Sequence, residues 1–404
     1  ASDDQTLTIT VTGTDDAPVI YIDPAASDTM VSAASGSNYE APEVAALADG
    51  GHVVVWSARF ASADQSGSGV YQQRYDSFGD KAGAPQLVNT TTSDDQTIGS
   101  VAANGSGWVV TWSSFGQDGS GWGVYAQRYD VIGTPVGGEV LVNQTVSGDQ
   151  LDANVGELAD GGYVVSWNGY DTTTGKSEIY ARMYEADGSA QTGAFIVNAT
   201  TANNQLTQAF ASENVIGLAG GGFAVVWQDA SAPRMLARVY DAAGVAATDQ
   251  FVVSTNTGFG QTEGSVGAVG TGFVVTWSTY LLDSEFDVYA QRYDANGARV
   301  GSEFRANTST QHSQFASKVV ELSDGGFVIA WMSNAVPATT KYQIEGQRYD
   351  SNGNAVGGEF MVNSVVSSSD LNWPSMALRN DGALVVAWLH GSNSIEQTII
   401  TLPL

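Results

Sequence analysis

The sequence predicts an all-β protein, a seven-bladed β-propeller of four-stranded antiparallel blades. One phrase is repeated seven times along the chain: a tight glycine turn, then a β-prone run that closes on tryptophan. The copies recur about every 55 residues, and a fixed period of this length is typical of a repeat architecture. The tryptophans that close the copies are Trp56, Trp112, Trp167, Trp227, Trp277, Trp331 and Trp388.

The strand that ends on each tryptophan is apolar on both faces. In residues 273–277, Phe273, Val275 and Trp277 point to one side and Val274 to the other. An antiparallel sheet with one face in solvent would alternate apolar and polar residues, so this strand belongs to a sheet covered on both sides. Four-stranded sheets packed face to face around an axis form a propeller.

The strands within one repeat can be placed from the second copy. Short apolar runs separated by Asn-Gly and Asp-Gly type turns predict four strands, at residues 100–103, 108–112, 123–129 and 139–142. The first of these is rich in small residues, as the crowded axis of a propeller requires. The seventh repeat reaches Leu404 after only three strands. We therefore expect an N-terminal strand, at about Met30 to Ala33, to complete the last blade and leave no open sheet edge.

Composition and charge limit the partners. The 404 residues include 43 acidic and 15 basic side chains, a net charge of −28. The electrostatic field of this negative charge repels nucleic acid and anionic membranes, so neither is an expected partner. The absence of cysteine excludes disulfides and zinc–thiolate sites. No apolar run of about 18 residues is present to insert into a membrane.

The chain divides into a short leading segment, residues 1–20, and the propeller, residues 21–404. Residues 5–12 alternate threonine with other residues, as a half-buried strand does, yet nothing nearby can pair with them. No signal-peptide pattern opens the chain, so it is either cytosolic or a piece of a longer protein. Gly13 to Val19 resembles the closing segment of the cadherin-like (VCBS-type) repeats of large secreted bacterial adhesins. That resemblance makes residues 1–20 the last strand or linker of an upstream repeat; a disordered tail is the alternative.

Candidate binding residues stand in the loops that follow the tryptophans, because these loops vary between repeats while the glycine turns do not. Aromatic rings there stand beside carboxylates, a combination suited to sugars. The candidates for ligand binding are Trp122, Phe115, Asp118, Tyr170, Tyr280 and Phe286. The alternative is that the rings pack over the tops of neighbouring blades. A further insertion, Leu206 to Phe210, either caps the channel or contacts a partner.

A calcium site is a weaker expectation. Asp283, Glu285 and Asp287 supply the hard oxygen ligands that calcium prefers. They match no calcium-binding loop motif, and a solvated acidic loop is the alternative. A second recurrent residue, a glutamine near the start of most repeats, is expected to be structural and to fix the ring of blades.

The sequence predicts no enzyme and no catalytic residues. The histidines, His52, His312 and His390, stand in different repeats and at different strand positions, which argues against a Ser-His-Asp triad. The Ser-x-Asp-x-Gly-x-Thr-Trp sequence motif of sialidase propellers is absent. Glycosidases need only two carboxylates across a cleft, and the spacing of residues cannot exclude that arrangement.

The repeat as a whole resembles the blade repeats of large calcium-dependent bacterial adhesins of the RTX class, which are exported by type I secretion. The shared phrases are those of residues 324–331, 288–297 and 356–363. The resemblance implies a secreted or cell-surface location, with adjacent adhesin domains and an extracellular glycan or cell-surface ligand as partners. We therefore expect a non-enzymatic, glycan-binding module of an adhesin. The alternatives are a structural spacer or self-association module and, less favoured, a polysaccharide-active enzyme.

Overall fold

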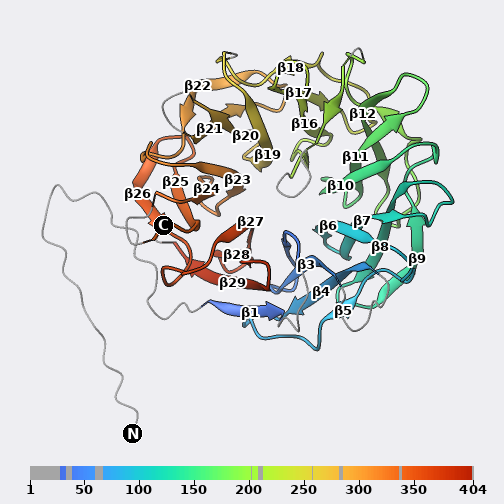
Figure 1. Cartoon of the computed structure of the whole chain (residues 1–404), viewed down its shortest axis with the longest axis horizontal. Coiled ribbons are helices and arrows are strands. Elements are labelled where there is room, and N and C mark those ends of the chain that lie inside the picture. Colours follow the sequence, from blue (N-terminus) through green and yellow to red (C-terminus); the bar gives the residue numbers. More distant parts are fainter. Residues whose placement is uncertain are drawn as a thin grey trace, which may run out of the picture.

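A computed structural model describes residues 28–32, 39–59, 67–201, 203–207, 213–256, 258–281, 285–335 and 339–402. Within these ranges every regular element is a β-strand, and the strands form seven antiparallel sheets arranged as a ring (Figure 1). The prediction of an all-β, seven-bladed propeller is confirmed. Residues 1–20 lie outside the described residues, so the strand or linker predicted there stays a prediction.

Each blade runs outward from the axis in chain order. Blade 1 is β2 (Glu43–Ala46), β3 (His52–Arg59), β4 (Ser68–Tyr75) and β5 (Gln86–Leu87); blade 2 is β6 (Gln96–Asn104), β7 (Gly107–Phe115), β8 (Trp122–Asp130) and β9 (Pro135–Leu141). Blade 3 is β10 (Gln150–Glu157), β11 (Tyr163–Asp171), β12 (Lys176–Tyr184) and β13 (Phe195–Ile196). Blade 4 is β14 (Gln205–Leu206), β15 (Val215–Gly217), β16 (Phe223–Asp229), β17 (Arg234–Tyr240) and β18 (Phe251–Val252). Blade 5 is β19 (Gln261–Val269), β20 (Gly272–Tyr280), β21 (Phe286–Tyr293) and β22 (Arg299–Arg305); blade 6 is β23 (Gln314–Glu321), β24 (Phe327–Ser333), β25 (Gln343–Tyr349) and β26 (Ala355–Met361).

Blade 7 joins the two ends of the chain. Its strands are β27 (Leu371–Leu378), β28 (Ala383–His390), β29 (Ser394–Thr401) and β1 (Thr29–Ser32). Thr29 pairs with Gln397 and Met30 with Glu396, so β1 is the outer strand of this sheet. Figure 1 shows β1, in blue, beside β29, in red. The predicted closing strand is confirmed, although Ala33 lies outside the described residues.

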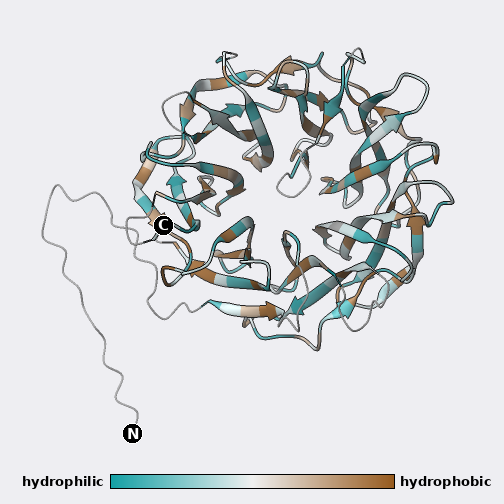
Figure 2. Ribbon diagram, in the orientation of Figure 1, coloured by the Kyte–Doolittle hydropathy of each residue, from teal (hydrophilic) through white to brown (hydrophobic). Residues whose placement is uncertain are grey.

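The core is distributed between the blades rather than gathered at one centre. Buried apolar side chains of the described residues form seven clusters. One of them joins Val53 and Val70 of blade 1 to Trp108 and Trp112 of blade 2. Figure 2 shows hydrophobic residues spread around the whole ring. Every residue of β24 is buried, which explains why this strand is apolar on both faces: each face packs on a different neighbouring sheet.

An asparagine just after most outer strands fixes the start of the junction to the third strand of its own blade. Asn143 Oδ1 accepts a hydrogen bond from the backbone N–H of Val124 at 2.7 Å, and its Nδ2 donates to the carbonyl of Thr145 at 3.0 Å. Four further residues do the same: Asn89, Asn198, Asn307 and Asn363. Because each is buried, the two bonds satisfy backbone groups that water cannot reach.

The recurrent glutamines are also buried and hydrogen-bonded. Gln150 Oε1 accepts from Trp167 Nε1 at 2.9 Å and Gln205 Oε1 from Trp227 Nε1 at 2.8 Å, so both orient the tryptophan of their own blade. Gln261 Oε1 instead accepts from the backbone N–H of Met235 in the preceding blade at 3.0 Å. The structural role predicted for these residues fits their contacts, but the partner differs from blade to blade.

The innermost strands carry a bulge that the sequence did not reveal. Their pairing shifts register near the start of β6, β10, β19, β23 and β27. At the bulge, Asp152, Glu263, Ala316 and Trp373 take left-handed φ values between +54° and +58°, unusual for residues other than glycine. In blade 4 the innermost strand is split at this place into β14 and β15. Leu206 is therefore part of a strand, and Gln208 to Phe210 of the predicted insertion lie outside the described residues.

Ring closure can be tested at β1. Val31 is fully buried against blade 1 and blade 7, whereas its neighbour Met30 is 49% exposed. Val31→Asp should lower the free energy of unfolding by about 3 kcal/mol or more, because it buries an unpaired carboxylate. Met30→Asn is the control, without a charge because Glu396 lies opposite, and should change it by less than about 0.5 kcal/mol. Urea unfolding followed by tryptophan fluorescence measures both, and equal losses would show that β1 does not close the ring.

Candidate functional site

The two faces of the ring carry different connections. The loop face is defined as the face that holds the hairpin between the second and third strands of each blade, together with the junctions between successive blades. The sequence-predicted binding residues lie on it: Phe115 ends β7 and Trp122 begins β8, while Tyr280 ends β20 and Phe286 begins β21. Tyr170 lies near the end of β11 and is 42% exposed. The structure does not bring these residues into one site.

Blade 2 carries a local aromatic pair. The rings of Phe115 and Trp122 face each other across the hairpin, edge to face, with centroids 5.4 Å apart. Asp118 lies in the turn between them, where its Oδ1 accepts a hydrogen bond from the backbone N–H of Ser120 at 3.0 Å. The backbone N–H of Trp122 donates to Asp149 Oδ1 at 3.1 Å. Asp118 thus helps to close its own turn.

A larger aromatic surface spans blades 5 to 7. It is called the aromatic patch here and consists of Tyr280, Phe286, Phe315, Tyr342 and Trp373. Successive ring centroids are 5.3 Å apart for Tyr280 and Phe286 and 6.1 Å for Phe286 and Phe315. Phe315 also meets Tyr342 at 5.1 Å and Trp373 at 6.3 Å, both edge to face. Rings from three blades therefore form one continuous surface on the loop face.

Three members of the aromatic patch were missed in the sequence. Phe315 and Trp373 lie at the bulges of β23 and β27, and Tyr342 immediately precedes β25. The sequence search was confined to the loops after the tryptophans, whereas a bulge turns residues of the innermost strand toward the loop face. The available signal was that Phe315 stands where two other repeats have Thr97 and Thr262, and that Trp373 stands where three others have Asp152, Glu263 and Ala316.

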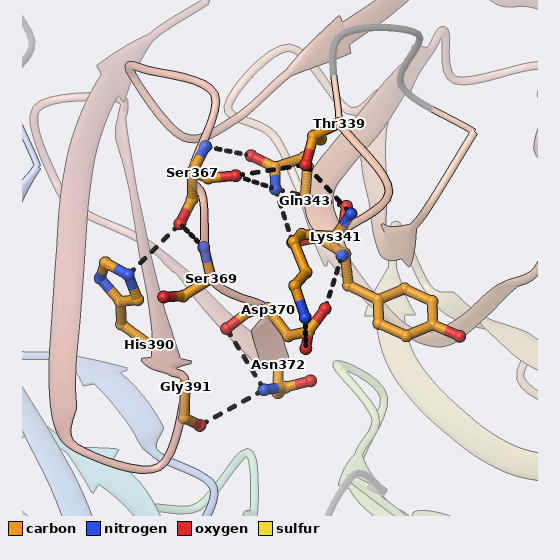
Figure 3. Close-up of polar contacts among 10 residues, drawn as sticks. Thr339, Lys341, Gln343, Ser367, Ser369, Asp370, Asn372, His390 and Gly391 are labelled. Atoms are coloured by element: carbon orange, nitrogen blue, oxygen red, sulfur yellow. Dashed lines mark hydrogen bonds and ion pairs between the residues drawn. The ribbon is translucent and has the colours of Figure 1, made fainter.

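Carboxylates surround Tyr342, which packs against Phe315 in the aromatic patch. Burial, together with the negative charges of Glu285, Asp370 and Glu263, raises the pKa of the Tyr342 hydroxyl. The backbone N–H of Tyr342 donates to Asp370 Oδ1 at 3.0 Å, and Asp370 Oδ2 pairs with Lys341 Nζ at 3.2 Å (Figure 3). The site therefore combines apolar ring faces with hydrogen-bond acceptors.

Glu263 is the most enclosed of these carboxylates. Its Oε2 accepts hydrogen bonds from Ser278 Oγ at 2.9 Å and from the backbone N–H of Ala316 in the next blade at 3.0 Å. Burial raises the pKa of Glu263 despite these two bonds, which act in the opposite direction. The carboxylate thus links blade 5 to the bulge of blade 6.

The predicted metal ligands do not converge in the part of the chain that is described. Asp283 lies outside it. Glu285 Oε2 accepts a hydrogen bond from Ser313 Oγ at 2.5 Å, whereas Asp287 is fully buried and accepts from Asn307 Nδ2 at 2.7 Å, with Arg305 3.5 Å away. The two described side chains thus have different hydrogen-bond partners, Ser313 for Glu285 and Asn307 for Asp287. No group of three acidic or histidine side chains suited to a metal is found among the described residues. Calcium binding itself stays an untested prediction.

The axis of the ring contains a cavity of about 360 Å³, lined by the innermost strands of all seven blades. The small residues predicted to line it, such as Ser100, Ala102 and Gly267, do so. Lys318, only 2% exposed, pairs with Glu43 at 3.0 Å and with Glu213 at 3.4 Å. These two ion pairs link blades 1, 4 and 6 around the cavity.

Burial and charge oppose each other in this cluster. Burial alone would lower the pKa of Lys318, but the charges of Glu213 and Glu43 outweigh it and raise the pKa. Burial raises the pKa of Glu213 even though Lys318 is beside it. Glu43 is further held by Ser375, whose Oγ donates to its Oε2 at 2.9 Å.

Removing the lysine should destabilise the ring in a pH-dependent way. Lys318→Met leaves two buried carboxylates without their cation and should lower the free energy of unfolding by about 3–5 kcal/mol at pH 8. The loss should be smaller at pH 5, because Glu213, whose pKa is raised by burial, then takes up a proton in the folded state and loses its charge. The exposed pair offers a control: Lys341→Met should cost less than about 1 kcal/mol at either pH. Chemical unfolding at the two pH values measures this, and a pH-independent loss would contradict it.

Comparison with known proteins identifies the fold alone. No protein-family model matches the chain, and no curated protein sequence matches it significantly. Among solved structures, a protein of unknown function from Dyadobacter fermentans has a TM-score of 0.58 at 10% identity, covering 96% of this chain and all of its own. A mutant of the NanB sialidase from Streptococcus pneumoniae has a TM-score of 0.53 at 10% identity, covering 93% of this chain and 71% of its own. The β-propeller domain of the Trilobed protease from Pyrococcus furiosus has a TM-score of 0.50 at 6% identity.

The prediction that the chain is not an enzyme is wrong. The chain shares its fold with the NanB sialidase, so the scaffold is one that carries catalysis. The prediction depended on a missing sialidase motif and on histidines scattered between repeats, and neither excludes other catalytic groups on this scaffold. Among the described residues no helix is long and apolar enough to cross a membrane.

Proposed function

We propose that the chain binds a neutral glycan at the aromatic patch on the loop face of blades 5 to 7. The observation that carries this proposal is the joining of five rings from three blades next to the carboxylates of Glu285, Glu263 and Asp370. An aromatic ring packs on the apolar face of a pyranose, and carboxylates accept hydrogen bonds from its hydroxyls. Sites with large apolar contact and a few fixed polar groups are typical of small-ligand binding.

The aromatic patch is both accessible and held in place. Tyr280 at its edge is 50% exposed, and the other four rings are partly exposed. Phe315 and Trp373 project from bulged strands, and Tyr342 is fixed through its backbone bond to Asp370. Rings that are positioned before the ligand arrives lose little conformational entropy on binding, which favours affinity.

Charge favours a neutral sugar over an acidic one. The three carboxylates that raise the pKa of the Tyr342 hydroxyl would repel a sugar carboxylate or sulfate. The nearby cation, Lys341, is already paired with Asp370. The net charge of −28 acts in the same direction.

We further propose that the module acts outside the cell, as part of a bacterial surface adhesin with neighbouring domains on the same chain. What supports this is the resemblance of its blade phrases to RTX-class adhesin repeats, together with the leading segment that resembles the end of a VCBS-type repeat. The chain's acidic character suits this location, since such a surface keeps a protein soluble at high salt.

A glycan array probed with the purified chain tests the binding proposal. We expect saturable binding to neutral glycans, and Tyr280→Ala should weaken it at least tenfold, because the exposed ring is lost without disturbing the core. Phe115→Ala is the matched control: this ring is 44% exposed on blade 2, outside the aromatic patch, and its loss should leave affinity unchanged. Repeating the array with calcium and with a chelator tests the calcium prediction at the same time.

Two results would contradict the proposal. If Phe115→Ala or Trp122→Ala weakens binding while Tyr280→Ala does not, the site lies on blade 2 instead. If no glycan binds in either condition, the glycan proposal fails and a spacer role within the adhesin becomes the better account.

A further inference from the structure

Three side chains of the last junction and last blade form a hydrogen-bonded chain on the loop face. Ser367 Oγ lies 3.3 Å from His390 Nε2, and His390 Nδ1 lies 2.7 Å from Glu396 Oε1. Ser367 precedes β27, His390 ends β28 and Glu396 lies in β29. Figure 3 shows Ser367 between Gln343 and His390. The scattered histidines argued against a Ser-His-Asp triad, but a triad needs only one histidine, and His390 has both a serine and an acid beside it.

The hydrogen bonds assign the proton positions. A Glu396 carboxylate only accepts, so the ring proton of a neutral His390 is on Nδ1 and the lone pair is on Nε2. Ser367 Oγ accepts a hydrogen bond from the backbone N–H of Ser369 at 3.0 Å, which directs its own hydrogen toward His390 Nε2. This is the arrangement in which a histidine can take the proton of a serine nucleophile while an acid orients the ring.

A buried glutamine fixes the serine from behind. Ser367 N–H donates to Gln343 Oε1 at 2.7 Å, and Gln343 Nε2 donates back to the Ser367 carbonyl at 3.2 Å. Gln343 is fully buried and is itself held by Asn363 Nδ2 at 3.0 Å. A nucleophile positioned by rigid second-layer contacts is what acyl-transfer sites require.

His390 departs from the repeat, so the scaffold does not need a histidine at this position. Opposite the tryptophan, four blades have a tyrosine that stacks on it: Tyr71, Tyr125, Tyr180 and Tyr289. Blades 6 and 7 have a glutamate there instead, Glu345 and Glu396. Two residues after the tryptophan the other blades have small or acidic residues: Ala58, Ser114, Gly169, Asp229, Thr279 and Ser333. Only blade 7 has a histidine.

The hydrogen bonds that hold the backbone of Ser367 also differ from those of the other repeats. In blades 2 and 6 the recurrent glutamine donates to the carbonyl three residues before it, from Gln96 to Ser93 and from Gln314 to Gln311. Blade 7 has Leu371 at the equivalent pairing position and cannot make this bond. The Ser367 carbonyl is satisfied by Gln343 from blade 6 instead.

The Ser367–His390–Glu396 group is accessible from the loop face. The His390 and Glu396 side chains are 31% and 18% exposed, enough for a substrate to reach the serine and for the acid to stay sheltered. Gln343 directly follows Tyr342, so the serine adjoins the end of the aromatic patch.

We propose that Ser367, His390 and Glu396 form a catalytic triad that hydrolyses a neutral carboxylic ester. Ser367 Oγ attacks the ester carbonyl carbon while its proton passes to His390 Nε2. The bond to the alcohol oxygen breaks, this oxygen takes the proton from His390, and an acyl-serine remains. Water then attacks the acyl carbon and gives its proton to His390; the bond to Oγ breaks, Oγ recovers the proton and the carboxylic acid leaves. Glu396 keeps the Nδ1 proton and stabilises the imidazolium in both steps.

The proposed triad can be tested in the full-length protein with p-nitrophenyl acetate and with a fluorophosphonate probe that labels activated serines. We expect wild-type hydrolysis and labelling at Ser367, located by peptide mass analysis. Ser367→Ala should abolish labelling and lower the rate by a factor on the order of 10² or more, and Glu396→Gln should lower the rate while leaving the serine in place. Ser368→Ala is the matched control: it removes an exposed hydroxyl beside Ser367, so its activity should stay at the wild-type level.

Circular dichroism and tryptophan fluorescence confirm that each variant is folded. Absence of labelling and of hydrolysis above that of Ser367→Ala in the folded wild type would overturn the proposal, as would labelling that persists in Ser367→Ala. The proposal does not depend on glycan binding, because neither the ester nor the fluorophosphonate probe contains a sugar. The two proposals can thus fail separately.

Discussion

Face-to-face packing of sheets that are apolar on both sides is the constraint on which this molecule depends. A blade such as that of β24 buries both faces of its second strand, so it cannot be stable alone and needs a neighbour on each side. A row of such sheets would always leave two uncovered ends. Closing the row into a ring removes them, and the lending of β1 to β29 completes the last sheet. The asparagines at the blade junctions then satisfy backbone groups that this packing removes from water.

The fold could be predicted because its signals are local and repeated. A glycine turn, a strand buried on both faces and a tryptophan recur often enough to give the number of blades without any knowledge of contacts. Even the closing strand follows from counting strands in the last repeat. None of these signals depends on what a side chain meets at a distance.

The site could be predicted only in part, because it depends on such distant contacts. Tyr280 and Phe286 were found, but Phe315 and Trp373 join them through bulges that have no signature in the sequence. Glu285 and Asp287 are two residues apart and would share a face in one strand. Glu285, however, precedes β21, so the two carboxylates find different partners. Ser367 and His390 meet only because the junction folds back on the hairpin 23 residues later.

The position of β1 has a mechanical consequence. Both described ends of the chain meet in blade 7, so tension applied between them loads the short pairing of β1 with β29 before any other sheet is stretched. That pairing includes Met30 opposite Glu396. A pull strong enough to peel β1 away would therefore release the backbone that carries Glu396 while the other six blades stay intact. In a chain anchored at one end and bound at the other, blade 7 would therefore be the first blade to open under force.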